Sequence, residues 1–381
     1  KGRGRFPGAY PRSLQHGVGP WVWDDQSRRY IDWICALGAI SLGYNDLSVD
    51  EAVRGQVFRG PIFSLSNVEL EERVAQRLVD LIPCAESVRF VKTGSEATEA
   101  AIRVARAYTG RDIVLTCGYH SWHSWYAATR AEHPGVPDAL TLLAQSFQYN
   151  DLVSLDLAIV RASEECEIRG AKRGGIQPSL RWHPGVAAII IEPTLIEPPA
   201  PGFLEGVRER ASRIGAVLIF DEMVTGFRWH AGGYQALCGV MPDLATFGKG
   251  MSNGYPQAAL VGRSDIMRYA MLVSGTFGGD CIGLTAADAT LARYQQGGVC
   301  EHMWRLGARI IDGYNALAEK HGAPTRAVGQ APHPVLRWDE EITDREVTSG
   351  GVLIEGPARF ATNRHRASLF FQETVKRGHL L

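Results

Sequence analysis

The chain has 381 residues, of which 45% are hydrophobic and 21% are charged, and its formal net charge is -1 at pH 7. This apolar content excludes a disordered chain, and the balanced charge excludes a basic nucleic-acid binder. No apolar run approaches the roughly 18–20 residues of a membrane-spanning helix, so the composition predicts a globular protein with no membrane partner.

Near the N-terminus, the sequence GVGPWVWDDQSRRYIDW predicts a hairpin in which the polar residues Asp24–Ser27 turn between two aromatic-rich strands. Further along, short runs rich in Val, Ile, Leu and Phe alternate with helical patterns, which is typical of βαβ units and a mostly parallel sheet. The runs lack polar alternation, as expected of strands covered on both faces. The predicted strands are Ser87–Val91, Asp112–Thr116, Leu140–Ala144, Val186–Glu192, Ala216–Asp221 and Ala258–Gly262.

Helices are predicted between these strands. The clearest is Ser95–Tyr108, which carries apolar residues at helical spacing and is followed by Gly110 as a stop signal. The others are Leu152–Glu167, Leu204–Ile214 and Arg263–Met271, and the segment Cys281–Lys320 is long and helical. We therefore predict an α/β protein with a large domain over residues 61–285. A small domain would combine residues 1–60 with residues 286–381.

The segment after the first predicted strand can bind an anion. Gly94 and two hydroxyl residues, Thr93 and Ser95, lie where a helix begins. Free backbone N–H groups and the positive end of the helix dipole favour a phosphate there. The same residues also fit an ordinary capped helix, since Thr93 and Glu96 have capping-box spacing. Neither a P-loop nor a dinucleotide fingerprint is present.

The second predicted strand is followed by the aromatic cluster GYHSWH, residues 118–123. Its rings can cover the face of a flat ligand by stacking. Two histidines in one loop, His120 and His123, without further ligands at metal spacing are more typical of packing residues. We therefore predict no metal site.

Two carboxylates and one lysine complete the candidate set. Glu192 and Asp221 end buried strands, where a carboxylate loses hydration unless a cation or hydrogen bonds meet it. Pairing with arginine is the structural alternative, but two such residues on separate strands favour a function. Lys249 lies between Gly248 and Gly250, and a lysine in a Gly-lined pocket has a lowered pKa and becomes nucleophilic. A surface lysine in a Gly-rich loop is the alternative.

Taken together, these features match the requirements of pyridoxal 5'-phosphate (PLP). The cofactor needs an anchor for its phosphate, a cover for its ring, a counter-ion for its pyridinium nitrogen and an amine for its aldehyde.

The motifs VWDDQSRRYIDW, TGSEAT, GYHSWH, IIIEP, LIFDEMVTGFR, FGKGMSNGYP and GTFGG follow one another in this order. In this order they resemble the class III, fold-type I PLP-dependent aminotransferases, most closely the glutamate-1-semialdehyde 2,1-aminomutase-like branch. The resemblance implies a mostly parallel seven-stranded sheet in the large domain and a small α+β domain built from both chain ends. It implies a homodimer with shared active sites. Because the family continues further, it also implies that the small domain is truncated at Leu381.

The resemblance assigns the reacting groups. Lys249 would be the Schiff-base lysine and the group that moves the proton on the substrate. Asp221 would keep the ring nitrogen of the cofactor protonated, and Glu192 would support the network around the ring hydroxyl. Gly94 and Ser95 would bind the phosphate.

Further positions are implied around the cofactor ring. Tyr119 would stack on one face, with His120 beside it as a cofactor contact. Met223 would pack under the ring where the family usually has Val, and Ser121 stands where the family usually has Gly. Thr276, in GTFGG, would reach the phosphate of the cofactor in the neighbouring subunit.

The implied activity is a PLP-dependent transaminase that moves an amino group from an amino donor to a keto or aldehyde acceptor, through a Lys aldimine and pyridoxamine phosphate. An intramolecular aminomutase of the glutamate-1-semialdehyde type uses the same residues, but GTFGGD and the loop Tyr119–Leu140 differ from its usual sequence. A non-catalytic homologue that binds only cofactor or a partner has no reason to keep both Lys249 and Asp221. The sequence does not identify the substrate. If the substrate has a carboxylate, the candidates for binding it are Arg228, Arg12 and Arg130.

Two features bear on location. The seven cysteines are an odd number without a C-x-x-C pair, which is typical of reduced thiols rather than of a disulfide framework. The basic residues 1–5 are not followed by an apolar stretch, so no signal peptide is expected. We expect a cytoplasmic protein.

Overall fold

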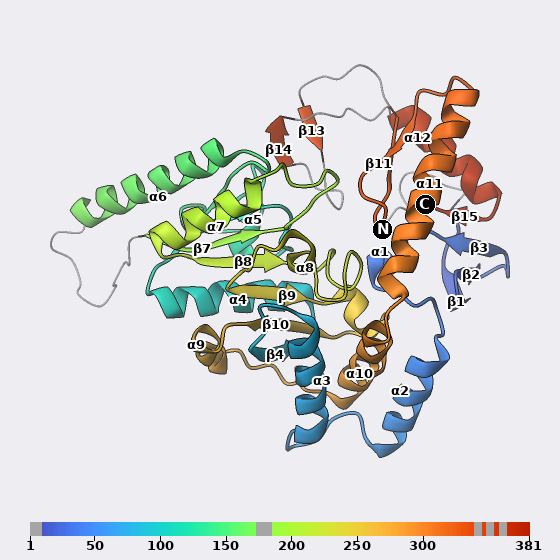
Figure 1. Ribbon diagram of the computed structural model, residues 1–381, viewed down its shortest axis with the longest axis horizontal. Helices are drawn as coiled ribbons and strands as arrows, with labels where there is room; N and C mark the ends of the chain where they lie inside the picture. Colours follow the sequence, from blue (N-terminus) through green and yellow to red (C-terminus); the bar gives the residue numbers. More distant parts are fainter. Residues whose placement is uncertain (1–9, 173–184, 339–344, 348–353, 358–363) are drawn as a thin grey trace.

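The computed structural model describes residues 10–172, 185–338, 345–347, 354–357 and 364–381, and a seven-stranded sheet lies at its centre (Figure 1). The strand order is β4-β10-β9-β8-β7-β5-β6. This confirms the predicted α/β fold with a seven-stranded sheet. The strands are β4 (Ser87–Val91), β5 (Ile113–Cys117), β6 (Ala144–Ser146), β7 (Val186–Ile191), β8 (Val217–Asp221), β9 (Leu244–Phe247) and β10 (Ala258–Gly262).

The direction of the strands brings several carboxyl ends to one edge of the sheet. Strands β6, β5, β7, β8 and β9 pair in parallel. Strand β10 is antiparallel to both β9 and β4. Because two reversals restore the direction, β4 points the same way as β9. The segments that follow β4, β5, β7, β8 and β9 therefore lie at the same edge.

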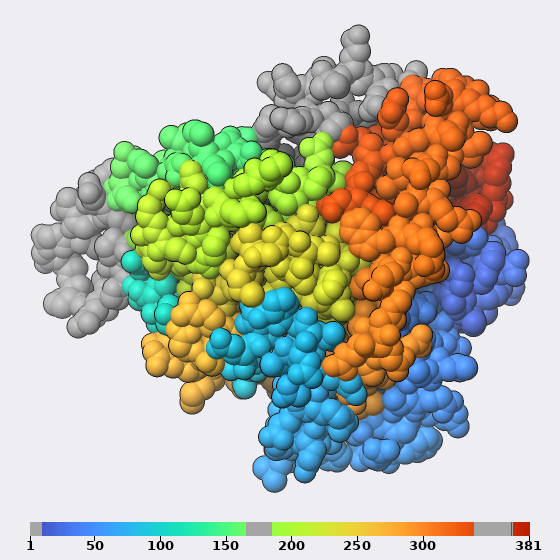
Figure 2. Space-filling model, in the orientation of Figure 1, coloured from blue at the N-terminus to red at the C-terminus, as the bar shows by residue number. Residues whose placement is uncertain are grey.

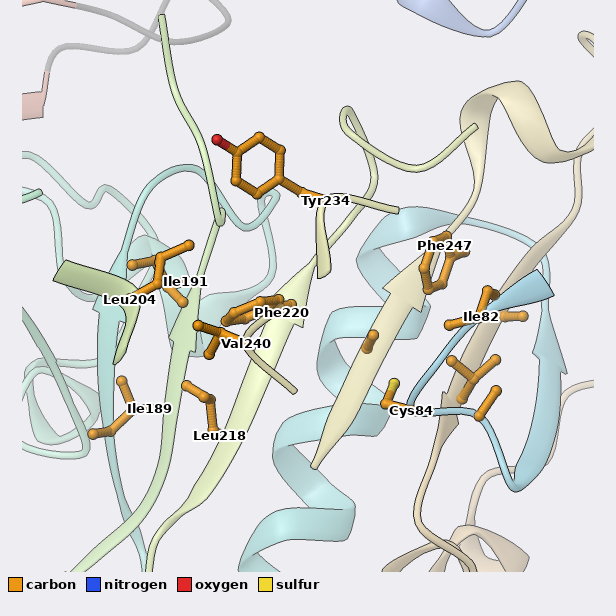
Figure 3. Close-up of a cluster of buried hydrophobic side chains, with 14 of the residues drawn as sticks. Ile82, Cys84, Ile189, Ile191, Leu204, Leu218, Phe220, Tyr234, Val240 and Phe247 are labelled. Carbon is orange, nitrogen blue, oxygen red and sulfur yellow. The ribbon is translucent and has the colours of Figure 1, made fainter. Parts of the chain in front are cut away.

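Helices cover both faces of the sheet. In β7, Ile189 and Ile191 pack on the face that carries α3 (Val68–Leu81), α6 (Leu152–Lys172) and α7 (Phe203–Ile214). Ala188 and Ile190 pack on the other face, against α4 (Gly94–Thr109). Figure 3 shows the first of these cores, where strand residues such as Leu218 meet side chains of the covering elements. Burial on both faces explains why the strand sequences lack polar alternation.

Some predicted elements differ from the structure. The predicted strand Leu140–Ala144 is wrong over most of its length, because a 3₁₀ turn (Asp138–Leu140) follows Pro137 and β6 begins only at Ala144. Strand β9 was not predicted, since its four residues give too short a run. The predicted helix Arg263–Met271 is α9 (Ser264–Met267) followed by a 3₁₀ helix (Arg268–Leu272). The segment Cys281–Lys320 divides into α10 (Cys281–Gln295) and α11 (Val299–Lys320), because Gly297 and Gly298 have positive φ.

The two chain ends lie together on one side of the molecule (Figures 1 and 2). Strands β1 (Leu14–Val18), β2 (Trp21–Asp24) and β3 (Arg29–Asp32) form the expected hairpin region, and β15 (His379–Leu380) pairs with β3. The carboxylate of Asp24 closes the turn by accepting from the backbone N–H groups of Gln26 and Arg28. The remaining elements are α1 (Cys35–Gly38), α2 (Leu47–Arg59), α5 (Ser124–Ala127), α8 (Gln235–Cys238), β11 (Arg326–Val328), β12 (Val335–Arg337), β13 (Arg345–Val347), β14 (Ile354–Pro357) and α12 (Arg364–Lys376).

Within the described ranges, none of the helices combines the length and the apolar character that crossing a membrane requires.

Candidate active site

The predicted site residues other than Thr276 lie at the shared edge of the sheet. Ligands of open α/β sheets bind beyond the carboxyl ends of the strands. Each segment that follows such an end here carries candidates: residues 92–95 after β4, residues 118–120 after β5, Glu192 after β7, Asp221 at the end of β8, and Lys249 after β9.

A buried histidine and a buried aspartate form the centre of this edge. The His120 Nδ1 atom lies 2.8 Å from Asp221 Oδ2, and the two residues are 1% and 3% exposed. The other ring nitrogen, Nε2, lies 3.2 Å from the carbonyl oxygen of Cys117. Both ring nitrogens therefore face oxygen atoms. The second carboxylate oxygen of Asp221 accepts from Thr246 Oγ1 at 3.1 Å and from the Met223 N–H at 3.2 Å. These contacts fix the orientation of the carboxylate.

Glu192 lies beside this pair and is itself buried. Its Oε1 atom accepts a hydrogen bond from the backbone N–H of Tyr119 at 2.6 Å. Burial, together with the negative charge of Asp221, raises the pKa of Glu192 to about 7. Gly118, with φ of 109°, permits this close approach, because a Cβ atom there would lie 2.8 Å from Glu192 Oε1.

The raised pKa of Glu192 predicts a pH-dependent stability. Between its ordinary value of 4.5 and about 7, the unfolded chain releases this proton while the folded chain keeps it. The free energy of unfolding therefore falls as the pH rises through this interval, by roughly 3 kcal/mol at most. Glu192→Gln should remove this fall, as measured by denaturant unfolding of the cofactor-free protein at pH 5 and pH 8. The exposed Glu72→Gln is the matched control, and a Glu192→Gln variant with the parent's pH dependence would contradict the prediction.

Lys249 follows β9 in a left-handed backbone conformation, with φ of 43°. Its side chain is half-buried, and its amine has no hydrogen-bond partner in the described part of the chain. Burial lowers the pKa of Lys249, assisted by the charge of Arg228 and opposed by the charges of Asp221 and Glu192. A lysine with a lowered pKa holds a larger fraction of neutral amine and is a better nucleophile.

The start of α4 has the features of a phosphate cradle. The predicted capping box is present: Thr93 Oγ1 accepts from the Glu96 N–H, and the Glu96 carboxylate accepts from the Thr93 N–H. No acceptor among the described residues meets the N–H groups of Gly94 and Ser95, which lie in the first turn. A Cβ atom at Gly94 would lie 2.9 Å from Met223 Sδ, so only glycine leaves this approach open. The capped helix and the anion site are thus compatible.

Three further predicted positions have distinct surroundings. Met223 Sδ lies between Gly94 and Gly248, where a Cβ atom on either glycine would be 2.9 Å away. Ser121 has φ of 94°, a conformation that favours glycine, the residue that the sequence resemblance implies at this position. Thr276 is exposed and lines a recess of about 410 Å³ that contains none of the other predicted site residues.

Sequence reasoning missed two supporting residues. Thr246 lies opposite Asp221 in the parallel pairing of β8 and β9, and Thr98 Oγ1 donates to the carbonyl oxygen of His120 at 3.2 Å. Neither residue could be recognised from the neighbouring sequence. The strand register places Thr246 beside Asp221, and the packing of α4 places Thr98 beside His120. That the protein has no metal site stays a prediction from the sequence. No cluster of three or more metal-ligating side chains occurs within the described residues.

The residues present fit PLP. The edge of the sheet offers an amine with a lowered pKa, an oriented carboxylate for a pyridinium nitrogen, and N–H groups with a glycine gap for a phosphate. The Tyr119 ring packs edge-on against Tyr126, and Met223 Sδ lies close to Gly94 and Gly248.

Comparison with known proteins agrees with this chemistry. Residues 7–330 match the family described as aminotransferase class-III. The 3-aminobutyryl-CoA aminotransferase of Cloacimonas acidaminovorans (strain Evry) is 37% identical over 339 residues, which cover 88% of this chain and 78% of the relative. The glutamate-1-semialdehyde 2,1-aminomutase of Syntrophobacter fumaroxidans (strain DSM 10017 / MPOB) is 32% identical over 401 residues, which cover 98% of this chain and 84% of the relative.

A solved structure shows the same fold. The FumI protein of Sphingopyxis sp. MTA144, in its PLP internal aldimine form, superposes with a TM-score of 0.81 at 24% identity, covering 100% of this chain and 83% of that one. Class III aminotransferases depend on PLP. The chain therefore belongs to the class III aminotransferase family and is a PLP-dependent transaminase.

Proposed function

We propose that this transaminase transfers an amino group between two molecules, from an amino donor to a keto or aldehyde acceptor. One observation carries the proposal. The Lys249 amine, with its lowered pKa, lies at the same sheet edge as the buried His120–Asp221 pair. When bound, PLP supplies an electron sink for the charge that develops on the substrate carbon.

Each residue has a defined task in this proposal. Lys249 would hold the aldehyde of the cofactor, and its amine would move a proton on the substrate. Asp221, oriented by His120 and Thr246, holds the proton on the pyridine nitrogen. Glu192 supports the ring hydroxyl, in keeping with its place next to Asp221.

The remaining proposed contacts hold the phosphate and the ring of the cofactor. At the start of α4, the Gly94 and Ser95 N–H groups bind the phosphate. Tyr119 and Met223 would cover the faces of the ring, and His120 would be a further cofactor contact.

We further propose a homodimer with shared active sites. The recess that holds Thr276 is also lined by Phe63 and Leu65, and Leu65 is 84% exposed. Exposed apolar side chains of this kind mark protein interfaces. A partner chain on this face would receive Thr276 at its phosphate site. The domain division at residues 1–60, 61–285 and 286–381 and the cytoplasmic location remain part of the same proposal.

An intramolecular aminomutase is the second candidate, because a relative with that name aligns over 98% of this chain. It would use the same residues but return the amine to the same molecule. A non-catalytic homologue would have no use for the lowered pKa of Lys249.

The experiment follows the visible absorbance of the holoenzyme. An amino donor should bleach the cofactor band, and an added keto acid should restore it, with turnover only when both are present. Turnover of a single amino-aldehyde without added keto acid would identify the aminomutase instead. Absence of bleaching by any donor would overturn the transaminase proposal.

A further inference from the structure

The side chain of Gln330 joins two loops that leave the shared edge of the sheet. Gln330 lies in the turn between β11 and β12. Its Oε1 atom accepts a hydrogen bond from Trp229 Nε1 at 3.0 Å, and its Nε2 atom donates to Thr194 Oγ1 at 2.5 Å. Thr194 lies in the loop after β7 and Trp229 in the loop after β8, and both are 3% exposed. One amide thus bridges the loops that begin at Glu192 and Asp221.

The chemistry of the two partners requires an amide at position 330. An indole N–H can only donate, so the atom that faces Trp229 must be an acceptor. The Thr194 hydroxyl donates its own hydrogen to the carbonyl oxygen of Glu197 at 3.3 Å, so it needs a donor from Gln330. Glutamine offers one acceptor and one donor at the same end. A carboxylate or an apolar side chain would satisfy at most one of the two partners.

Further contacts hold the β11–β12 turn and α11 against the same loops. Gly329 has φ of 92°, and a Cβ atom there would lie 3.3 Å from the carbonyl oxygen of Ile196. Trp304, on α11, donates from Nε1 to the carbonyl oxygen of Trp229 at 2.8 Å. Trp229 is therefore held at its ring by Gln330 and at its backbone by Trp304. The C-terminal part of the chain is in direct contact with both loops.

The first loop transmits this contact to Glu192. Only Pro193 separates Thr194 from Glu192, and the proline ring fixes one of the two backbone dihedrals of that residue. Glu192 is bonded to the Tyr119 N–H and is close enough to Asp221 for that charge to raise its pKa. A shift of Thr194 therefore moves the carboxylate of Glu192 relative to Asp221.

The second loop connects Trp229 to Asp221 through a series of hydrogen bonds. The Trp229 N–H donates to the carbonyl oxygen of Thr225 at 3.1 Å. The Thr225 hydroxyl donates to the carboxylate of Glu222, which is 0% exposed. Glu222 directly follows Asp221 in the chain. The loop is thus closed at its base by Glu222, and its far end is held by the contact with Gln330.

We propose that Gln330 is a positioning residue of the reaction: its amide sets the separation of the Glu192 and Asp221 carboxylates by fixing the two loops that follow them. This inference rests on the proposed function, in which Asp221 serves the ring nitrogen of PLP and Glu192 serves the ring hydroxyl. Two groups that must meet two atoms of one rigid ring tolerate little change in their separation, since a misplacement of about 1 Å can cost roughly 100-fold in rate.

Hydrogen exchange of the cofactor-free protein tests the structural part of the proposal. Gln330→Met keeps the length of the side chain and removes both hydrogen bonds, so the amides of residues 193–197 and 225–230 should exchange at least about fivefold faster. Asn315→Leu is the matched control, because the Asn315 amide is also half-buried and makes two hydrogen bonds, both to Ala327. It should speed exchange at Ala327 and leave both loops unchanged. Unchanged exchange of both loops in Gln330→Met overturns the proposal.

Kinetics of the holoenzyme test the functional part, with the amino donor that bleaches the parent fastest. Gln330→Met should lower kcat about tenfold and change KM by less than about threefold, whereas Asn315→Leu should keep kcat within about twofold of the parent. Thr194→Val removes the same contact from the other side and should also lower kcat about tenfold, while Thr194→Ser keeps the hydroxyl and the parent rate. The double variant Gln330→Met/Thr194→Val should lose little more than either single variant, because both substitutions break one contact.

The outcomes separate a positioning role from a merely structural one. A kcat within about twofold of the parent in Gln330→Met, or losses that multiply in the double variant, overturns the proposal. If Gln330→Met does not fold, the comparison of Thr194→Val with Thr194→Ser decides, and equal rates in these two variants overturn it. A parent holoenzyme that no donor bleaches fails the transaminase proposal itself, whereas an active parent with an unaffected Gln330→Met variant fails only the role of Gln330.

Discussion

The Lys249→Ala variant is expected to lose turnover, with kcat reduced by at least about 10⁴-fold, because a positioned acid–base group alone contributes roughly 10²–10⁴-fold and the covalent attachment is lost as well. The amine is suited to both tasks, since burial lowers the pKa of Lys249 and the described residues offer its amine no hydrogen-bond partner. Steady-state kinetics of the purified variant, with folding checked by circular dichroism, give the result.

Lys92 supplies the matched control for this loss. It is a second partly buried lysine at the same sheet edge, and its pKa is lowered to about 8 by burial. Its amine, however, is engaged by Asp280 and by Gln257. Lys92→Met should therefore retain turnover of the folded enzyme. Parent-like activity in Lys249→Ala, or its loss only in Lys92→Met, would place the reacting amine elsewhere.

Asp221→Asn is expected to leave the fold intact and to lower kcat by about 10²-fold or more, which corresponds to about 3 kcal/mol of electrostatic stabilisation. Asparagine keeps the size of the side chain and can still accept from Thr246 Oγ1. It cannot hold a proton on the pyridine nitrogen by its charge, and it alters the hydrogen bond that the buried His120 ring makes at this position. Steady-state kinetics of the variant measure the loss of kcat, and thermal unfolding measures separately whether its stability has changed.

Asp243 offers the contrasting substitution. It is also a buried aspartate, but it lies before β9, at the opposite edge of the sheet, and pairs with Arg208 and Arg263. Asp243→Asn should lower stability and leave kcat of the folded enzyme unchanged. A loss of less than tenfold in Asp221→Asn would mean that another acid serves the pyridine nitrogen.

The strand ends could be predicted from sequence for a physical reason. A strand buried on both faces is a run of apolar residues, so a polar residue that ends the run, such as Asp221 or Glu192, stands out. Lys249 also stands out, since glycines flank it, and one of them, Gly248, lets Met223 approach. Parallel pairing then brings these ends to one edge of the sheet.

The contacts between segments could not be predicted in this way. The pairing of His120 with Asp221 depends on loop geometry over 101 residues of sequence, and the position of Thr246 depends on strand register. The contact of Arg228 with Gly38 depends on how the N-terminal segment packs against the loop after β8, 190 residues away in sequence. Contacts between residues so far apart in the chain leave no recognisable pattern in the sequence around either residue.

The most direct measurement is reduction of the resting holoenzyme with borohydride, followed by digestion and mass spectrometry of the peptides. We expect a pyridoxyl group on the peptide that contains Lys249, and on Lys249 itself. A pyridoxyl group on another lysine, or none on that peptide, would contradict it.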